Sequence, residues 1–130
     1  MATLTIHDET VSGVKSCALE LELPGGTIRA RELIASRVEE EVRRFNAQAT
    51  EVFHGLVQPS GSERLLNGYK LRTPRRIQPR PQVERALNAF TRNGFFLLVN
   101  DRQIENLDEE IAIGLNTQVA FVKLVPLVGG

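Results

Sequence analysis

The stretch that decides the fold is Gln118-Val-Ala-Phe-Val-Lys-Leu-Val-Pro-Leu-Val-Gly-Gly130, an apolar run followed by two glycines. Val119 to Val125 is predicted to be a strand, which Pro126 interrupts because proline lacks the backbone N–H that a strand ladder uses. Glycine has no side chain to pack and loses more conformational freedom on ordering than any other residue. Two glycines do let a main chain pass through a narrow channel. The pair therefore predicts a threading segment that ends in a carboxylate.

Short strands are predicted just upstream of that stretch. Phe95-Phe-Leu-Leu-Val99 is a continuous apolar run, which is typical of a central and well-covered strand. Asn100-Asp101 indicates a turn, and Arg102-Gln-Ile104 is expected to be a short partner strand. Leu107-Asp-Glu-Glu-Ile111 is expected to form one helical turn. The last third of the chain is thus predicted to contain three strands.

The first third of the chain is predicted to form a hairpin followed by a helix. Residues 3–7 and Cys17-Ala-Leu-Glu-Leu-Glu-Leu23 alternate with period two, which predicts half-buried strands. Pro24-Gly-Gly26 breaks the second strand, and Thr27 is expected to be the N-cap of a helix. From Ile28 to Phe45 the apolar residues step by three and four, as on one face of an amphipathic helix. These apolar residues are Ala30, Leu33, Ile34, Val38, Val42 and Phe45.

The middle of the chain, residues 46–93, interrupts this regular pattern. Residues 46–69 show no clear period, and residues 71–81 contain three prolines, so irregular structure is expected there. Pro81 suits the first turn of a second helix, and Asn93-Gly94 is expected to end it. The whole chain is therefore predicted to be an α+β protein in which a helix crosses one face of a mixed sheet.

Composition places the chain among ordinary globular domains. It has 130 residues, 42% of them hydrophobic and 25% charged, which fits one domain with a sizeable core. No apolar stretch is long enough to span a bilayer, and no signal peptide is visible at the N-terminus. The single cysteine, Cys17, excludes an internal disulfide and fits a reducing compartment. We predict a cytoplasmic location without membrane attachment.

The formal net charge is zero, but the charges are unevenly distributed. Eight of the sixteen basic residues lie between Arg64 and Arg92, against one acid, Glu84. Such a segment could contact nucleic-acid phosphates, but only Tyr69 lies nearby to stack on a base. A solvated face or a surface for a protein partner is therefore favoured over nucleic acid.

The remaining chemistry-bearing residues indicate no active site. Cys17 is expected to be a buried core thiol, because nothing local would make it reactive. His7 and His54 lack ligand partners at metal spacing, so no metal site is predicted. No glycine-rich phosphate loop, zinc-protease motif or nucleophile elbow is present. The acidic run Asp108-Glu-Glu110 is interpreted as surface charge, with contact to a basic groove of a partner as the alternative.

The order strand-strand-helix-strand-strand-strand, followed by Gly-Gly, resembles the ubiquitin-like β-grasp family. The segments at residues 95–104, 107–111, 117–121 and 128–130 look like the small sulfur-carrier subunit of molybdopterin synthase and its relatives. Thr27-Ile-Arg-Ala-Arg-Glu-Leu-Ile34 resembles the helix start of the same fold. Residues 46–93 depart from that pattern as a helical and loop insertion between the main helix and the third strand. This departure indicates a divergent branch, one that resembles the modifiers of bacterial ubiquitin-like conjugation systems.

The resemblance implies a single β-grasp domain over residues 1–130, with a mixed β-β-α-β-β-β sheet and a flexible tail at 126–130. It implies a protein substrate, not an enzyme. The Gly130 carboxylate, with an ordinary pKa of about 3.3–3.7, would attack the α-phosphate of ATP on an E1-like activating enzyme. The acyl-adenylate would pass to a cysteine thiolate as a thioester and then to a target amine as an isopeptide bond. ATP would belong to the activating enzyme, and no cofactor would be bound by this chain.

The same resemblance implies the partners and the residues that meet them. Gly129 would thread beside Gly130, and the residues before them would guide the tail: Leu124, Val125, Pro126, Leu127 and Val128. The partners would be the activating enzyme, an E2-like conjugating enzyme, a deconjugating protease and the target protein.

Two alternatives stay open at this point. If the acceptor is a sulfide donor, the product is a thiocarboxylate, and the chain is a sulfur carrier for cofactor or tRNA biosynthesis. The chain could also be a plain β-grasp binding module with incidental glycines. The size of the 46–93 insertion favours the modifier, because a sulfur carrier needs only a tail and a small docking face.

Overall fold

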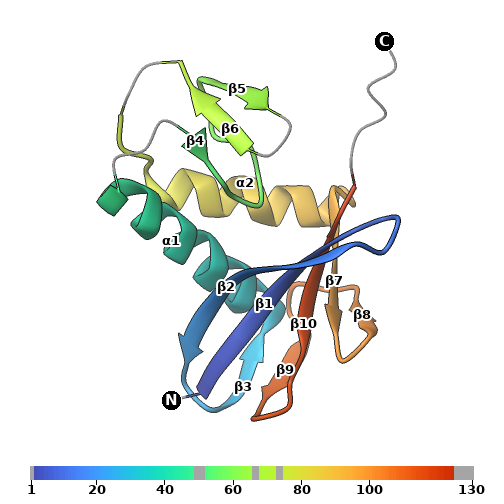
Figure 1. Ribbon diagram of the computed structural model, residues 1–130. Helices are drawn as coiled ribbons and strands as arrows, with labels where there is room; N and C mark the ends of the chain where they lie inside the picture. The colour runs from blue at the N-terminus through green and yellow to red at the C-terminus, as the bar shows by residue number, and fades with distance from the viewer. Residues whose placement is uncertain (1, 49–51, 66–67, 73–74, 125–130) are drawn as a thin grey trace.

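A computed structural model describes residues 2–48, 52–65, 68–72 and 75–124 (Figure 1). Within these residues it has two helices and three sheets, so the predicted α+β class with a mixed sheet is confirmed. None of the described helices is both long and apolar enough to cross a membrane.

The main sheet has five strands in the order β2-β1-β10-β7-β8. β1 (Ala2–Thr10) and β2 (Lys15–Leu23) form the predicted hairpin, and β7 (Phe95–Val99) and β8 (Arg102–Ile104) form a second antiparallel pair. β10 (Val119–Lys123) lies between the two pairs, parallel to β1 and antiparallel to β7. The last strand of the chain therefore occupies the centre of the sheet.

Helix α1 (Ala30–Gln48) crosses one face of this sheet (Figure 1). Its residues Leu33, Ile34 and Val38 are fully buried, in the same apolar cluster as Leu4 and Ile6 of β1. Leu19, Leu21 and Leu23 of β2 are buried on that face too, as their alternation predicts. The side chain of Cys17 lies outside the described part of the structure.

The prediction that Thr27 caps a helix starting at Ile28 is wrong. Gly26–Arg29 is a strand, β3, which pairs antiparallel with β9 (Glu110–Ile113), and α1 begins at Ala30. The first helical N–H groups, those of Ala30 and Arg31, donate to the carbonyls of Glu109 and Leu107. The partner that turns residues 26–29 into a strand is thus far away in sequence.

The helical turn predicted for Leu107–Ile111 is also wrong beyond its first residues. A turn forms at residues 107–108, after which the chain enters β9 at Glu110. Ile111 and Ile113 are buried in β9 while Ala112 between them is exposed, so tertiary burial selects a period of two.

The middle of the chain is more regular than predicted. A second sheet of order β4-β6-β5 is formed by β4 (Val52–Phe53), β5 (Ser62–Leu65) and β6 (Gly68–Leu71), where only loops were expected. α2 (Pro79–Thr91) follows and packs against α1, starting two residues before the predicted Pro81. Its end at Arg92 and Asn93, where Asn93 has φ 59°, agrees with the predicted stop.

Candidate functional site

The central strand β10 positions the start of the predicted tail. β10 ends at Lys123, and Leu124 follows it with 36% of its surface exposed. Parallel pairing places Lys123 opposite Thr10, at the end of β1. The other predicted tail residues lie outside the described residues: Val125, Pro126, Leu127, Val128, Gly129 and Gly130. The structure thus locates the point at which the chain leaves the sheet.

A buried arginine lies beneath this point. Arg37 of α1 is only 1% exposed, and its guanidinium donates to both carboxylate oxygens of Asp8 on β1, at 2.5 and 2.9 Å. It also donates to Glu41, one helical turn further along α1, at 3.1 and 3.2 Å. Its Cζ lies 4.6 Å from the centre of the Phe121 ring on β10. Arg37 therefore joins α1 to the two parallel strands at the centre of the sheet.

Lys123 extends this ion cluster to the middle of the chain. Its Nζ lies 3.3 Å from Asp8 Oδ2 and donates to the carbonyl of Gly55 at 3.4 Å. Glu41 Oε1 accepts a hydrogen bond from the backbone N–H of Leu56 at 3.2 Å. The last residue of β10 and the chain at Gly55 and Leu56 are thus held by the same four charged side chains: Asp8, Arg37, Glu41 and Lys123.

The pKa values of the two carboxylates of the cluster shift in opposite directions. Burial alone would raise the pKa of Asp8, but the hydrogen bond and charge of Arg37, together with Lys123, outweigh it and hold that pKa below its ordinary value. For Glu41, deeper in the protein, burial prevails over the attraction of Arg37 and raises the pKa. Asp8 is therefore the firmly ionised partner of Arg37.

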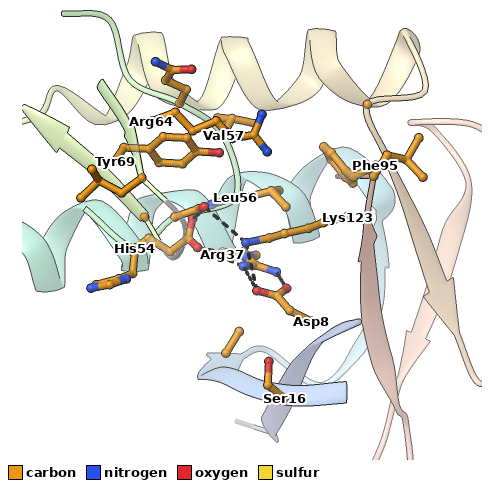
Figure 2. Close-up of a pocket in the computed structure, with 18 residues that line it drawn as sticks. Asp8, Ser16, Arg37, His54, Leu56, Val57, Arg64, Tyr69, Phe95 and Lys123 are labelled. Atoms are coloured by element: carbon orange, nitrogen blue, oxygen red, sulfur yellow. Dashed lines mark hydrogen bonds and ion pairs between the residues drawn. The ribbon is translucent and has the colours of Figure 1, made fainter. Parts of the chain in front are cut away.

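A cavity of about 620 Å³ opens between this cluster and the second sheet (Figure 2). The hairpin of β1 and β2, α1 and the end of β10 form one side. The chain at 54–58 and the hairpin of β5 and β6 form the other, with Tyr69 and Arg64 facing the cluster across the cavity. Leu124 is among the lining residues. The first residue after β10 thus lies at the wall of a cavity that the middle of the chain completes.

The charges of the ion cluster are matched within the protein. The acids of the cluster, Asp8 and Glu41, are paired with Arg37 and Lys123, so their charges balance. Burial raises the pKa of the Tyr69 phenol, which keeps it neutral as a hydrogen-bonding group. The cavity therefore offers a polar surface beside Leu124.

The sequence pattern predicted the strand before the tail but did not identify the ion cluster. A sequence signal was available, because Arg37 and Glu41 fall between Ile34, Val38 and Val42 on the face of α1 that turns inward. Charged residues four apart on an apolar helical face indicate a buried ion pair, yet nothing in the sequence shows that Asp8 and Lys123 complete it.

Metal binding and the acidic run at residues 108–110 can also be examined in the structure. The described residues contain no group of three or more His, Cys, Asp or Glu side chains placed to hold a metal ion. In the acidic run, Asp108 pairs with Arg31 at 2.9 Å and Glu109 pairs with Arg102. Those two carboxylates are therefore engaged within the protein itself.

Comparisons with protein-family models, with curated proteins and with solved structures found no match to this chain.

Proposed function

We propose that this chain is a ubiquitin-like modifier, activated at the carboxylate of Gly130 and conjugated to an amine of a target protein. An E1-like enzyme would join that carboxylate to the α-phosphate of ATP and release pyrophosphate. A cysteine thiolate would then displace AMP to form a thioester, and the target amine would displace the thiolate.

The single observation that carries the proposal is the central position of β10. A strand held between β1 and β7 is anchored along both edges, so the residues after Lys123 leave from a rigid base. The order β2-β1-β10-β7-β8, with β1 and β10 parallel and α1 across one face, supports a β-grasp assignment. Leu124 then begins the segment that ends in the Gly129-Gly130 motif.

The middle of the chain favours a modifier over a sulfur carrier. It forms a second sheet and a helix, and the ion cluster ties it to the end of β10 through Gly55 and Leu56. A structured surface beside Leu124 adds area that dedicated conjugating enzymes could recognise. A carrier that only delivers sulfur gains little from such a surface.

Intact mass spectrometry tests this function with a protein that ends at Gly130. The protein is incubated with ATP and a candidate E1-like enzyme, with and without the E2-like enzyme and the target. We expect an ATP-dependent thioester that reducing agent cleaves, followed by a reductant-resistant adduct through Gly130. The matched control lacks Gly129 and Gly130 and should form neither product.

The other outcomes separate the alternatives. A mass gain equal to the exchange of one oxygen for sulfur, without a protein adduct, identifies a sulfur carrier and overturns the modifier. Full biological function of the variant without Gly129 and Gly130 contradicts both and leaves the β-grasp binding module.

A further inference from the structure

The cations of the middle segment differ from those in the rest of the protein in how they are paired. We define the middle segment as the described residues between 52 and 92, and the body as residues 2–48 and 93–124. Each part contains eight basic residues. In the body, six of the eight are in ion pairs: Arg31, Arg37, Arg43, Arg44, Arg102 and Lys123.

The middle segment is almost without such pairs. Among its described residues the one ion pair is Arg80 with Glu84, at 3.9 Å and on exposed side chains. Arg75 donates to the carbonyl of Ser60. The other six have no acidic partner in the described structure, and all eight are exposed: Arg64, Lys70, Arg72, Arg75, Arg76, Arg80, Arg85 and Arg92.

The resulting charge separation is large for a chain with no net charge. The middle segment holds eight basic residues and two acids, Glu63 and Glu84, a net charge of +6. The rest of the chain must then carry −6, because the formal total is zero. Like charges within one segment repel one another, and the eight cations of this segment have only one ion pair among the described residues. A binding partner of opposite charge would relieve that repulsion.

We infer that the exposed cations of the middle segment form a docking surface for an acidic face of a partner protein. The cations lie on the β5–β6 hairpin, on the connection that follows it and along α2 (Figure 1). Seven of the eight are arginines, whose planar guanidinium pairs with carboxylates through two hydrogen bonds. The inference does not depend on the Gly130 chemistry.

Two features favour a protein over a nucleic acid. The segment exposes no aromatic ring for base stacking, because Phe53 and Phe90 are buried and Tyr69 faces the cavity. The negatively charged body also repels a long polyanion that extends past the middle segment. A protein with one acidic patch instead matches a finite basic surface, and the charge separation orients it during approach.

Fluorescence anisotropy with two labelled probes tests the inference on the full chain. One probe is an oligo-glutamate peptide, and the other is duplex DNA with the same number of negative charges. The test variant is Arg72→Glu/Arg85→Glu, and the matched control is Lys15→Glu/Arg29→Glu. The control reverses two cations of the body that are exposed and have no ion-pair partner among the described residues. Circular dichroism confirms that both variants fold.

The peptide should bind at low salt and weaken as salt is added. The test variant should bind the peptide about tenfold more weakly, and the control should bind it with nearly the affinity of the unmodified protein. Equal losses in the two variants would mean that only net charge matters and would overturn the docking surface. Tighter binding of DNA than of the peptide would overturn the choice of partner, and no binding of the peptide at low salt would overturn the inference.

Discussion

Arg37 shows how a charged residue is accommodated in the core of this protein. Removing a guanidinium from water costs several kcal/mol, so it is tolerated only when its donors and charge are matched. Asp8 and Glu41 provide that match, and the face of Phe121 covers the guanidinium. Because the partners come from β1 and α1, with Lys123 of β10 bound to the same aspartate, the cluster specifies how these elements meet.

Asp8→Asn should lower the free energy of unfolding by about 2 kcal/mol. The substitution removes the ionised partner of a buried guanidinium and leaves Arg37 with Glu41 alone. Urea unfolding followed by circular dichroism measures the change. The matched control is Glu9→Gln on the same strand, because Glu9 has no ion-pair partner among the described residues, and it should change stability by less than about 0.5 kcal/mol. Equal effects of the two substitutions would contradict the role assigned to Asp8.

Acid should destabilise the protein as the pH falls from about 4.5 towards 2. Hydrogen bonds from Arg43 and Arg44 lower the pKa of Glu40 to about 2, and the pKa of Asp8 is lowered as well. A carboxyl with a lowered pKa stabilises the fold above its ordinary pKa and loses that effect as the pH falls through the folded value. Glu41, whose pKa is raised, acts in the opposite direction and offsets part of the loss.

Urea unfolding at a series of pH values measures this dependence. The free energy of unfolding should depend less steeply on pH in Asp8→Asn than in the unmodified protein. The reason is that Asp8, one of the two carboxyls with a lowered pKa, is absent and only Glu40 remains. An unchanged slope would show that Asp8 has an ordinary pKa in the folded state.

At the scale of elements, side-chain hydrogen bonds to the backbone hold the irregular segments around Val57 and Ile77 in place. Asn46 at the end of α1 donates to the carbonyl of Ile77 and accepts from its N–H, both at 3.0 Å. Gln82 of α2 is buried and donates to the carbonyl of Val57 at 2.7 Å. The bonds of Asn46 tie the middle segment to α1 of the body, and the bond of Gln82 ties α2 to Val57 in the wall of the cavity.

Gly55→Ala should disrupt that wall. A Cβ at residue 55 would lie 2.1 Å from a ring carbon of Phe53, which is itself 1% exposed and cannot move without disturbing the core. We expect a loss of about 1–3 kcal/mol, as for other overpacked sites. Gly25→Ala is the matched control, because a Cβ there meets no atom within 4 Å.

Differential scanning calorimetry on both variants measures the effect. If Gly55→Ala and Gly25→Ala melt at the same temperature, the close packing of residues 53–56 against the body is not what the structure indicates.

At the scale of the whole molecule, one apolar core joins the main sheet to the middle segment. Phe53, Leu71 and Phe90 from the middle belong to the same buried cluster as Leu97 and Phe121 of the main sheet. Phe45 of α1 packs edge to face against Phe53, with ring centres 5.5 Å apart. A shared core predicts that the two parts stabilise each other.

The protein should therefore unfold in a single cooperative transition. Tyr69 is the one tyrosine in a chain without tryptophan, so its fluorescence reports on the middle segment alone. Circular dichroism reports on all helices and strands. Urea midpoints from the two probes should coincide, and a tyrosine transition at lower urea would show that the middle segment unfolds independently.

The sequence by itself determined the elements whose signal is local. Alternation in β1 and β2, the apolar run of β7 and the three-and-four spacing in α1 are consequences of backbone geometry that a short window displays. The α+β class followed from these, and so did the last strand, predicted to run to Val125 and observed as β10 from Val119 to Lys123. The uneven charge was visible too, because composition needs no structure.

Only the tertiary structure decided which distant residues meet. Residues 26–29 are a strand because β9 pairs with them, and β4, β5 and β6 are too short for a period to show in sequence. The ion cluster forms because parallel pairing brings the ends of β1 and β10 together over α1. Burial and long-range pairing are properties of the folded chain, so the cavity beside Leu124 is visible only there.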